Sequence, residues 1–257
     1  LLVERDGTVQ HQNICSSAFY THTNTSIGFV INPFTISMKT GLVGTFRSMK
    51  SDLTGVPDSI GGMVNNLSMH YLNIYVSPEV EINTTAFNLK LKLPVSYMPY
   101  WYYDKLLGNT NNNNKLFVSP SLSMNYYITS KFSASASGDI CQTGVNEQLF
   151  YSGLLLGDYH NLYQGYIDYR NGHSASASLN LAYRDPLKAF FSRLEVGYQW
   201  NYSPLSSSRR FMGDYILNSY LNHDNRSHNW SINGHISKGV DWLGTILTLN
   251  SNYSKTT

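Results

Sequence analysis

Tyrosine side chains gather in one irregular stretch of the sequence, between residues 138 and 172. Tyrosine offers a flat ring for stacking and a hydroxyl group for hydrogen bonding, and surface loops carry many of the ligand contacts of proteins. We therefore expect this stretch to form an external loop that contacts a small ligand; packing of the rings on one another is the competing interpretation. The candidate ligand-binding residues are Tyr151, Tyr159, Tyr163, Tyr166 and Tyr169.

Residue spacings typical of catalysis do not occur in this sequence. It contains no GxSxG, HExxH, Walker-type, GxGxxG or CxxC motif. His223 and His228 are five residues apart with no third ligand nearby, so we expect no metal site. We also expect no cofactor and no enzyme activity.

Four charged side chains compose a candidate acid–base set: Glu79, Glu81, Arg193 and Glu195. All four fall on the polar faces of predicted strands, so we expect them to line a polar interior instead of catalysing a reaction. Cys15 and Cys141 are far apart in sequence and lack metal-ligand spacing. Two unrelated free thiols are the expected state.

The composition narrows the class of protein. Charged residues make up only 13% of the 257 residues, whereas about 25% is typical of soluble domains, and the chain has 20 Tyr. The formal net charge of +2 and the absence of a basic stripe favour no nucleic-acid partner. No run approaches the ~18 consecutive apolar residues that a membrane-spanning helix needs. Low charge, many tyrosines and no apolar block are typical of a membrane β-barrel.

The stretch Phe87–Tyr103 alternates between apolar and polar side chains along its whole length. Successive side chains of a strand point to opposite faces, so this period of two predicts a β-strand with one apolar face. It is longer than the five or six residues of an average strand, and its apolar face ends in Trp and Tyr, which favour a bilayer interface. The pattern predicts a transmembrane strand.

Similar alternation predicts about ten strands in the whole chain. Beside 87–103, they cover 21–31, 34–46, 70–82, 116–129, 132–137, 175–183, 190–202, 230–236 and 247–253. The connections sort by length. Short turns are expected near 32, 84, 130, 186 and 241, and long loops at 51–65, 104–115, 138–172 and 204–225. Membrane barrels place short turns on the periplasmic side and long loops outside.

This sorting gives the strand Phe87–Tyr103 a direction. It should run outward, with its odd-numbered face toward lipid and with Lys90, Lys92 and Ser96 toward the lumen. Four aromatic residues are expected to anchor the barrel at the outer membrane interface: Trp101, Tyr103, Trp200 and Tyr202. An open sheet edge is unstable in a bilayer, so we expect residues 1–257 to be one partial barrel domain, truncated at both ends.

Several segments resemble the barrels of TonB-dependent receptors of Bacteroidetes. They are the turn Tyr183–Phe191 (YRDPLKAFF), the strand Ser227–Lys238 (SHNWSINGHISK), and Gly138–Ile140 followed by the Tyr-rich loop. The resemblance implies a barrel of about 22 strands in the outer membrane of a Gram-negative bacterium. It also implies a plug domain, the partner TonB, and import of a siderophore, glycan or peptide. The chain departs from that family in having no recognisable plug, TonB box or C-terminal aromatic signal.

Other functions fit the same pattern. A passive porin-like channel would share the barrel wall without a plug. A barrel used as an adhesin, or a soluble β-sandwich or solenoid, would not transport at all. Outer-membrane lipid and an unidentified small ligand are the partners expected under the first interpretation.

Overall fold

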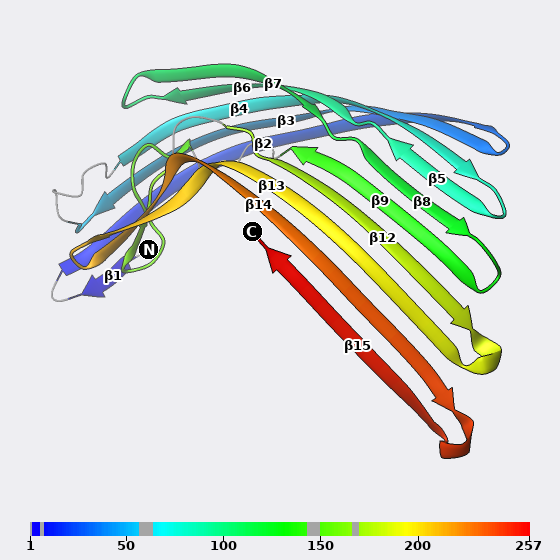
Figure 1. Ribbon diagram of the computed structural model, residues 1–257. Coiled ribbons are helices and arrows are strands. Elements are labelled where there is room, and N and C mark those ends of the chain that lie inside the picture. Colours follow the sequence, from blue (N-terminus) through cyan, green and yellow to red (C-terminus); the bar gives the residue numbers. More distant parts are fainter. Residues whose placement is uncertain (1, 6–7, 57–63, 143–149, 166–169) are drawn as a thin grey trace.

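The computed structural model describes residues 2–5, 8–56, 64–142, 150–165 and 170–257. Its strands form one sheet, mostly antiparallel, that curves into the wall of a barrel (Figure 1). Within the described ranges, no helix is long and apolar enough to cross a membrane. The curved antiparallel sheet has the expected fold class, an antiparallel transmembrane β-barrel.

The first eight strands cover the first half of the wall. They are β1 (Leu2–Arg5), β2 (Thr8–Ile31), β3 (Phe34–Thr54), β4 (Val64–Asn83), β5 (Phe87–Lys92), β6 (Val95–Asp104), β7 (Asn109–Val118) and β8 (Ser121–Tyr127). The others are β9 (Phe132–Gln142), β10 (Leu155–Leu156), β11 (Asn161–Tyr163), β12 (His173–Asp185), β13 (Phe190–Met212), β14 (Tyr215–Val240) and β15 (Thr245–Thr256). Two 3-10 turns, η3 (Pro186–Lys188) and η4 (Asp241–Leu243), join the last hairpins.

Neighbouring strands of the wall follow one another in sequence. The main order is β1-β2-β3-β4-β5-β8-β9-β12-β13-β14. In addition, β15 pairs with the free edge of β14, and β6 pairs with both β4 and β7. All ten predicted strands lie in this sheet. Several are much longer than the about nine to eleven residues that cross a membrane: β2, β3, β4, β13 and β14 have 24, 21, 20, 23 and 26 residues.

The five predicted short turns all lie at one end of the wall. They join β2 to β3, β4 to β5, β8 to β9, β12 to β13 and β14 to β15, and Figure 1 shows them along one side. The predicted placement of these five turns at one end is confirmed, and the strand that begins at Phe87 runs away from that end.

Two of the four predicted long loops are wrong. The Asn-rich residues of 104–115 form β7, whose asparagines pair with the aromatic strand β6, for example Trp101 with Asn112. Residues 204–225 likewise belong to a hairpin that continues β13 and β14. Each hairpin needs only a tight turn, with a glycine at positive φ: Gly108 (65°) and Gly213 (61°). Polar composition suggested loops, but backbone pairing to a neighbouring strand prevailed over local propensity.

The stretch Phe87–Tyr103 is broken once, at Leu93 and Pro94, into β5 and β6. Proline has no N–H to donate to the ladder. The register against β4 continues unchanged, because Leu91 pairs with Val80 and Val95 pairs with Val76. The prediction of a single unbroken strand is therefore wrong at Leu93 and Pro94, where Pro94 explains the interruption, but both parts pair with β4 in one register.

The two faces of the wall differ as predicted. On β6 the odd-numbered Tyr97, Trp101 and Tyr103 are exposed on the outer face, while Met98, Tyr100 and Tyr102 are buried on the inner face. One row of the outer face is aromatic across four neighbouring strands: Phe19, Phe46, His70 and Trp101. Ring centroids in this row lie 6.1 Å (Phe19–Phe46) and 5.6 Å (Phe46–His70) apart. A row of this kind is typical of a membrane-interface girdle.

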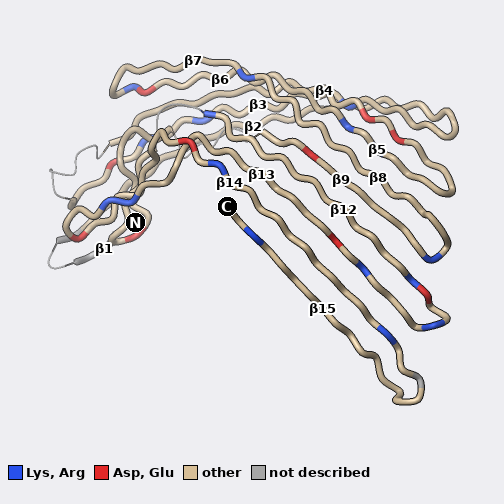
Figure 2. Tube along the Cα trace, in the orientation of Figure 1, with Lys and Arg blue, Asp and Glu red and all other residues tan. Residues whose placement is uncertain are grey.

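Charged residues are sparse along the strands (Figure 2). Near the short-turn end, the inner face of β4 and β5 carries an ion-pair cluster, in which Lys90 lies 2.6 Å from Glu79 and Lys92 lies 3.2 Å from Glu79. Lys90 and Lys92 thus face the interior, as predicted.

The hairpin β13–β14 contains one irregularity. Its register shifts between Ser203 and Leu205, just beyond the aromatic Trp200 and Tyr202. Such a β-bulge inserts one extra residue into one strand and bends it locally.

Candidate ligand-binding site

Residues 150–165, which lie between β9 and β12 in the sequence, fold into the interior at the end opposite the short turns. Phe150 is fully buried, with its ring 6.1 Å from that of Tyr100 and 5.3 Å from that of Tyr102. The Tyr102 hydroxyl donates a hydrogen bond to the Phe150 carbonyl at 2.9 Å. This aromatic contact ties the segment to β6.

Buried amides attach the same segment to β2 and β4. The Asn65 amide accepts a hydrogen bond from the Gly153 N–H at 2.7 Å and donates to Ser51 Oγ at 2.8 Å. Gln12 accepts one from the Leu156 N–H at 3.2 Å. Buried polar groups paired in this way make the loop position specific, because leaving any of them unpaired costs free energy.

The opposite side of the segment is attached to β14. The short strand β11 pairs with β14 in parallel, with Leu162 opposite Leu217. Leu154, Leu156 and Leu162 form a buried cluster with Tyr215 of β14 and with Leu53 of β3. The loop therefore bridges strands that are distant in the sheet.

An aspartate shapes the tip of the loop. Asp158 Oδ1 accepts hydrogen bonds from the N–H groups of His160 (2.9 Å) and Asn161 (2.8 Å). These bonds stabilise the charged form and hold the pKa of the Asp158 carboxyl below its usual range. The turn remains closed at neutral pH.

A cavity of about 490 Å³ lies beside this loop. The described residues that line it offer aromatic, aliphatic and amide groups, and none of them is charged. They are Ile14, Tyr151, Leu155, Leu156, Gly157, Tyr163, Gln164 and Tyr220. Its volume falls in the range of small-molecule sites, and such sites are mostly apolar with a few polar groups. The arrangement can stack on a ring and offer hydroxyl and amide hydrogen bonds.

The structure separates the predicted tyrosines. Tyr151 and Tyr163 both line the cavity. Tyr159 is 51% exposed at the loop tip, with its ring 4.2 Å from that of His160. Tyr166 and Tyr169 lie outside the described residues.

Other lining residues were missed in the sequence. Tyr220 belonged to a predicted loop, and Ile14 preceded the first predicted strand. The run Leu154–Leu155–Leu156 carried a usable signal, because three leucines inside a polar, irregular segment indicate burial.

The four charged residues of the proposed acid–base set do not form one site. Glu79 and Glu81 pair with lysines of β5, whereas Arg193 pairs with Glu195 on β13 at 3.1 Å. Strands β5, β8, β9 and β12 separate the two groups along the sheet. Within the described ranges, no three His, Cys, Asp or Glu side chains are placed to hold a metal ion. Cys15 and Cys141 are exposed free thiols.

The four predicted interface residues occupy the outer face beyond the middle of the wall. Trp101 and Tyr103 are 43% and 42% exposed on β6. Trp200 and Tyr202 are half-buried on β13, where Trp200 pairs with His228 and Tyr202 pairs with Arg226.

No protein-family model matches this sequence, and no curated protein matches it in sequence. The fold does match solved structures. The ferric citrate transporter FecA in its unliganded form superimposes with a TM-score of 0.63 and 9% identity, over 99% of this chain and 38% of that chain. The copper transporter OprC gives 0.62 and 8%, over 97% and 40%.

A third similar structure is the alcaligin outer-membrane receptor FauA from Bordetella pertussis, with a TM-score of 0.53 and 10% identity over 100% of this chain and 41% of that chain. The chain thus spans about two fifths of the length of these structures. At such identities the likeness shows the fold. The chain has the fold of the wall of outer-membrane transporter and receptor barrels, the fold class that its resemblance to TonB-dependent receptors implied.

Proposed function

We propose that this chain forms part of an outer-membrane receptor that imports a small ligand, and that the cavity beside the loop 150–165 is where the ligand first binds. The observation that carries the proposal is the position of the loop. It is held inside the wall by Phe150 and Asn65, on the side away from the short turns, where a ligand arriving from outside would meet it.

The similar structures support import as the activity. One is described as a ferric citrate transporter, another as a copper transporter and a third as an outer-membrane receptor for alcaligin. The proposal also includes TonB as the energy source, a plug domain and an origin in Bacteroidetes. These three parts rest on the resemblance of the segments Tyr183–Phe191 and Ser227–Lys238 to TonB-dependent receptors of Bacteroidetes. Siderophores, glycans and peptides remain the proposed ligand classes.

Binding measurements on two matched tyrosine variants test the ligand site. The protein is purified in detergent and titrated with ferric citrate, Cu²⁺, a ferric siderophore and a neutral oligosaccharide. For the probe that binds, Tyr163→Ala should weaken affinity by roughly tenfold, the loss expected for one aromatic contact. Tyr159→Ala, on the exposed tip, is the control and should leave the affinity unchanged. Equal effects of the two variants would contradict the cavity as the site.

Electrical measurements distinguish import from passive conduction. A receptor whose interior is occupied should give no steady conductance in a planar lipid bilayer, and uptake by cells should stop when a protonophore collapses the inner-membrane gradient. Stable open-channel currents together with protonophore-insensitive uptake would favour the porin-like channel instead.

A further inference from the structure

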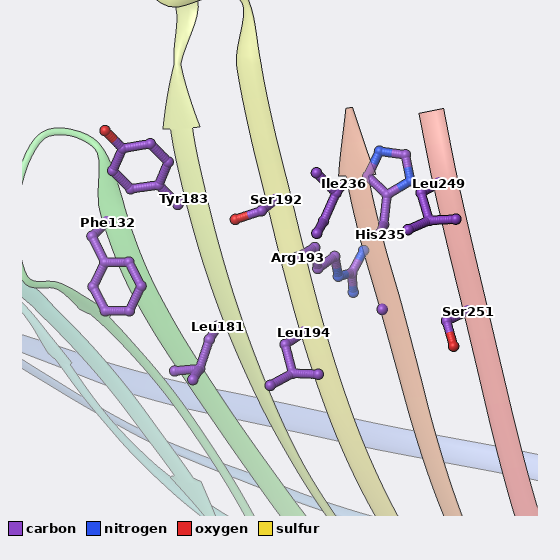
Figure 3. A pocket seen from close by; sticks show the side chains of 11 residues that line it. Phe132, Leu181, Tyr183, Ser192, Arg193, Leu194, His235, Ile236, Leu249 and Ser251 are labelled. Atoms are coloured by element: carbon purple, nitrogen blue, oxygen red, sulfur yellow. The ribbon is translucent and has the colours of Figure 1, made fainter. Parts of the chain in front are cut away.

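Two adjoining cavities lie on the wall at the short-turn end of β12–β15. The first has about 290 Å³ and is mainly apolar. Figure 3 shows Phe132 and Leu181 on one side of it, Ile236 and Leu249 on the other, and Leu194 between them. The second has about 510 Å³ and is lined by Tyr183, Asp185, Lys188, Phe190 and Lys238.

Small residues on neighbouring strands hollow the floor of the apolar cavity. Ser192 pairs with Ile236, Leu194 pairs with Gly234, and Gly234 pairs with Ser251. Each apolar lining residue belongs to the outer face, the same face as the exposed Leu194 and Leu249. The groove is therefore open toward the lipid side of the wall. Arg193 and His235, which belong to the opposite face of β13 and β14, also border the cavity (Figure 3).

The two cavities meet at Tyr183, which lines both. Its ring lies 5.8 Å from that of Phe190, so the junction between the polar and the apolar cavity is aromatic. Aromatic rings prefer the boundary between headgroups and hydrocarbon. Lys238 and Gly234 are four residues apart on β14, or about 14 Å along the strand, so the cationic cavity and the groove follow one another along the depth of one leaflet.

The polar cavity carries a positive charge. The Asp185 carboxylate is 1% exposed and already neutralised by Lys131 at 2.7 Å. Lys188 and Lys238 are exposed, and the Lys238 ammonium donates a hydrogen bond to the Lys188 carbonyl oxygen. The two lysines therefore add positive charge beyond what Asp185 offsets.

Apolar side chains project from the same end. Leu187 in η3 is 94% exposed, and Trp242 in η4 is 84% exposed. Trp favours the membrane–water interface, and an apolar side chain such as that of Leu187 is accommodated there as well. These two turns flank the lysine cavity.

We propose that this strip binds an anionic glycerophospholipid of the leaflet at the short-turn end. The phosphate lies between Lys188 and Lys238, the glycerol backbone rests on Tyr183 and Phe190, and one acyl chain follows the groove over Ser192 and Gly234. This site is distinct from the ligand cavity at the other end of the wall. It rests on the membrane location contained in the proposed function.

Lipid retention measured by native mass spectrometry tests the site. The protein is placed in nanodiscs of phosphatidylcholine and phosphatidylglycerol at a ratio of about 4:1, a composition chosen so that selection of the minor, anionic lipid is visible. Wild-type protein should retain phosphatidylglycerol in preference to phosphatidylcholine. Lys188→Gln with Lys238→Gln should lower that preference by roughly tenfold, since each lysine near a membrane surface attracts anionic lipid.

Two further variants separate headgroup, groove and general charge. Lys50→Gln with Lys105→Gln removes the same charge at the opposite end of the wall and should change nothing. Gly234→Leu fills the groove; a side chain has room there, because the nearest atom to an added Cβ is 3.8 Å away. It should reduce retention of both lipids. Lys188→Gln alone keeps the Lys238 ammonium and should give an intermediate loss.

Several outcomes would overturn the site. Unchanged selectivity in the Lys188/Lys238 double variant, or an equal loss in the Lys50/Lys105 control, excludes a specific headgroup site. Displacement of phosphatidylglycerol by inorganic phosphate alone would show a site for a free anion. None of these three results affects the ligand-import proposal. A protein that does not insert into nanodiscs would contradict the membrane location itself.

Discussion

Gly157 lies directly against the ring of Tyr163. A Cβ at this position would lie 2.2 Å from Tyr163 Cε2, closer than any real contact. Gly157→Ala should therefore displace the Tyr163 ring from the cavity and weaken ligand binding by roughly tenfold, as truncation of the ring does. Titration with the probe that binds the wild type measures this change.

A matched glycine supplies the control for that substitution. Gly28 on β2 has its nearest neighbour 3.6 Å from an added Cβ, an ordinary van der Waals contact. Gly28→Ala should leave affinity unchanged. If both alanine variants bind like the wild type, the position of Tyr163 does not matter for binding.

The pair Lys131–Asp185 makes the short-turn end sensitive to acid. The hydrogen bond from Lys131 lowers the pKa of Asp185, and Asp185 raises the pKa of Lys131. A lowered carboxylate pKa contributes stability that is complete above the unfolded value of about 3.9 and is lost as pH falls through the folded pKa. Hydrogen exchange at the Lys188 amide, which donates to Asp185, should accelerate below about pH 4 relative to its intrinsic rate.

Lys131→Met removes the main cause of that shift. The acid transition at the Lys188 amide should then move to higher pH, because the Asp185 carboxylate loses its partner. Lys105→Met, in a turn at the opposite end, is the control. A transition at the same pH in both variants would show that the ion pair does not set it.

At the scale of elements, Asn65 holds the loop 150–165 to β4. Its fully buried amide bonds to the Gly153 N–H, to Ser51 and to the Leu154 carbonyl. Asn65→Ala leaves these groups unpaired inside the wall, at a cost of about 1–3 kcal/mol per unsatisfied group. The loop should become accessible to limited proteolysis, with cleavage near residues 150–165 detected by mass spectrometry.

The neighbouring Asn66 provides the comparison. It belongs to the same strand but points to the other face, so Asn66→Ala should leave the loop protected. Equal cleavage of the two variants would mean that the amide contacts of Asn65 do not hold the loop.

Strand existence was predictable because a period of two is a local property of the sequence. In each run, such as Phe34 to Phe46, the apolar positions predict which side chains face lipid. In the structure these side chains lie on the outer face of the wall. Strand length was not predictable beyond the membrane, since polar residues such as Asn111 and Asn112 carry no alternation there. Their strand conformation comes from pairing with β6, which only the fold reveals.

The cavity was predictable in part. Aromatic content pointed to the loop and to Tyr151 and Tyr163, which line it. Tyr220 and Ile14 reach the cavity only because the loop folds back between β2 and β14. Such contacts join residues that are far apart in the sequence, and nothing local in the sequence encodes them.

At the scale of the whole molecule, the apolar band on the outer face matches a bilayer. On β3 it extends from Phe34 to Phe46, followed by Ser48, Lys50 and Asp52 on the same face. The stretch from Phe34 to Phe46 measures about 40 Å along the strand, or about 30 Å across the membrane at a tilt of about 40°. The wall therefore continues beyond the membrane on the loop side.

A charge in the middle of this band tests the membrane placement. Leu42→Arg should destabilise the barrel in lipid by about 2–4 kcal/mol, the cost of an arginine at the bilayer midplane. Val43→Arg places the same charge on the inner face, opposite Asn73, and should cost much less. Urea titrations of the protein in phospholipid vesicles give both values, and equal destabilisation would contradict the assignment of faces.

The bulge between Ser203 and Leu205 marks a boundary in how the chain can evolve. Below it, along Phe190 to Tyr202, losing or gaining one residue would exchange the lipid and lumen faces of everything up to the next turn. Above it, the hairpin lies outside the membrane, so an inserted residue moves no apolar side chain away from lipid. We expect the length of the wall to be inherited strictly within the membrane and to drift freely in the hairpin beyond it.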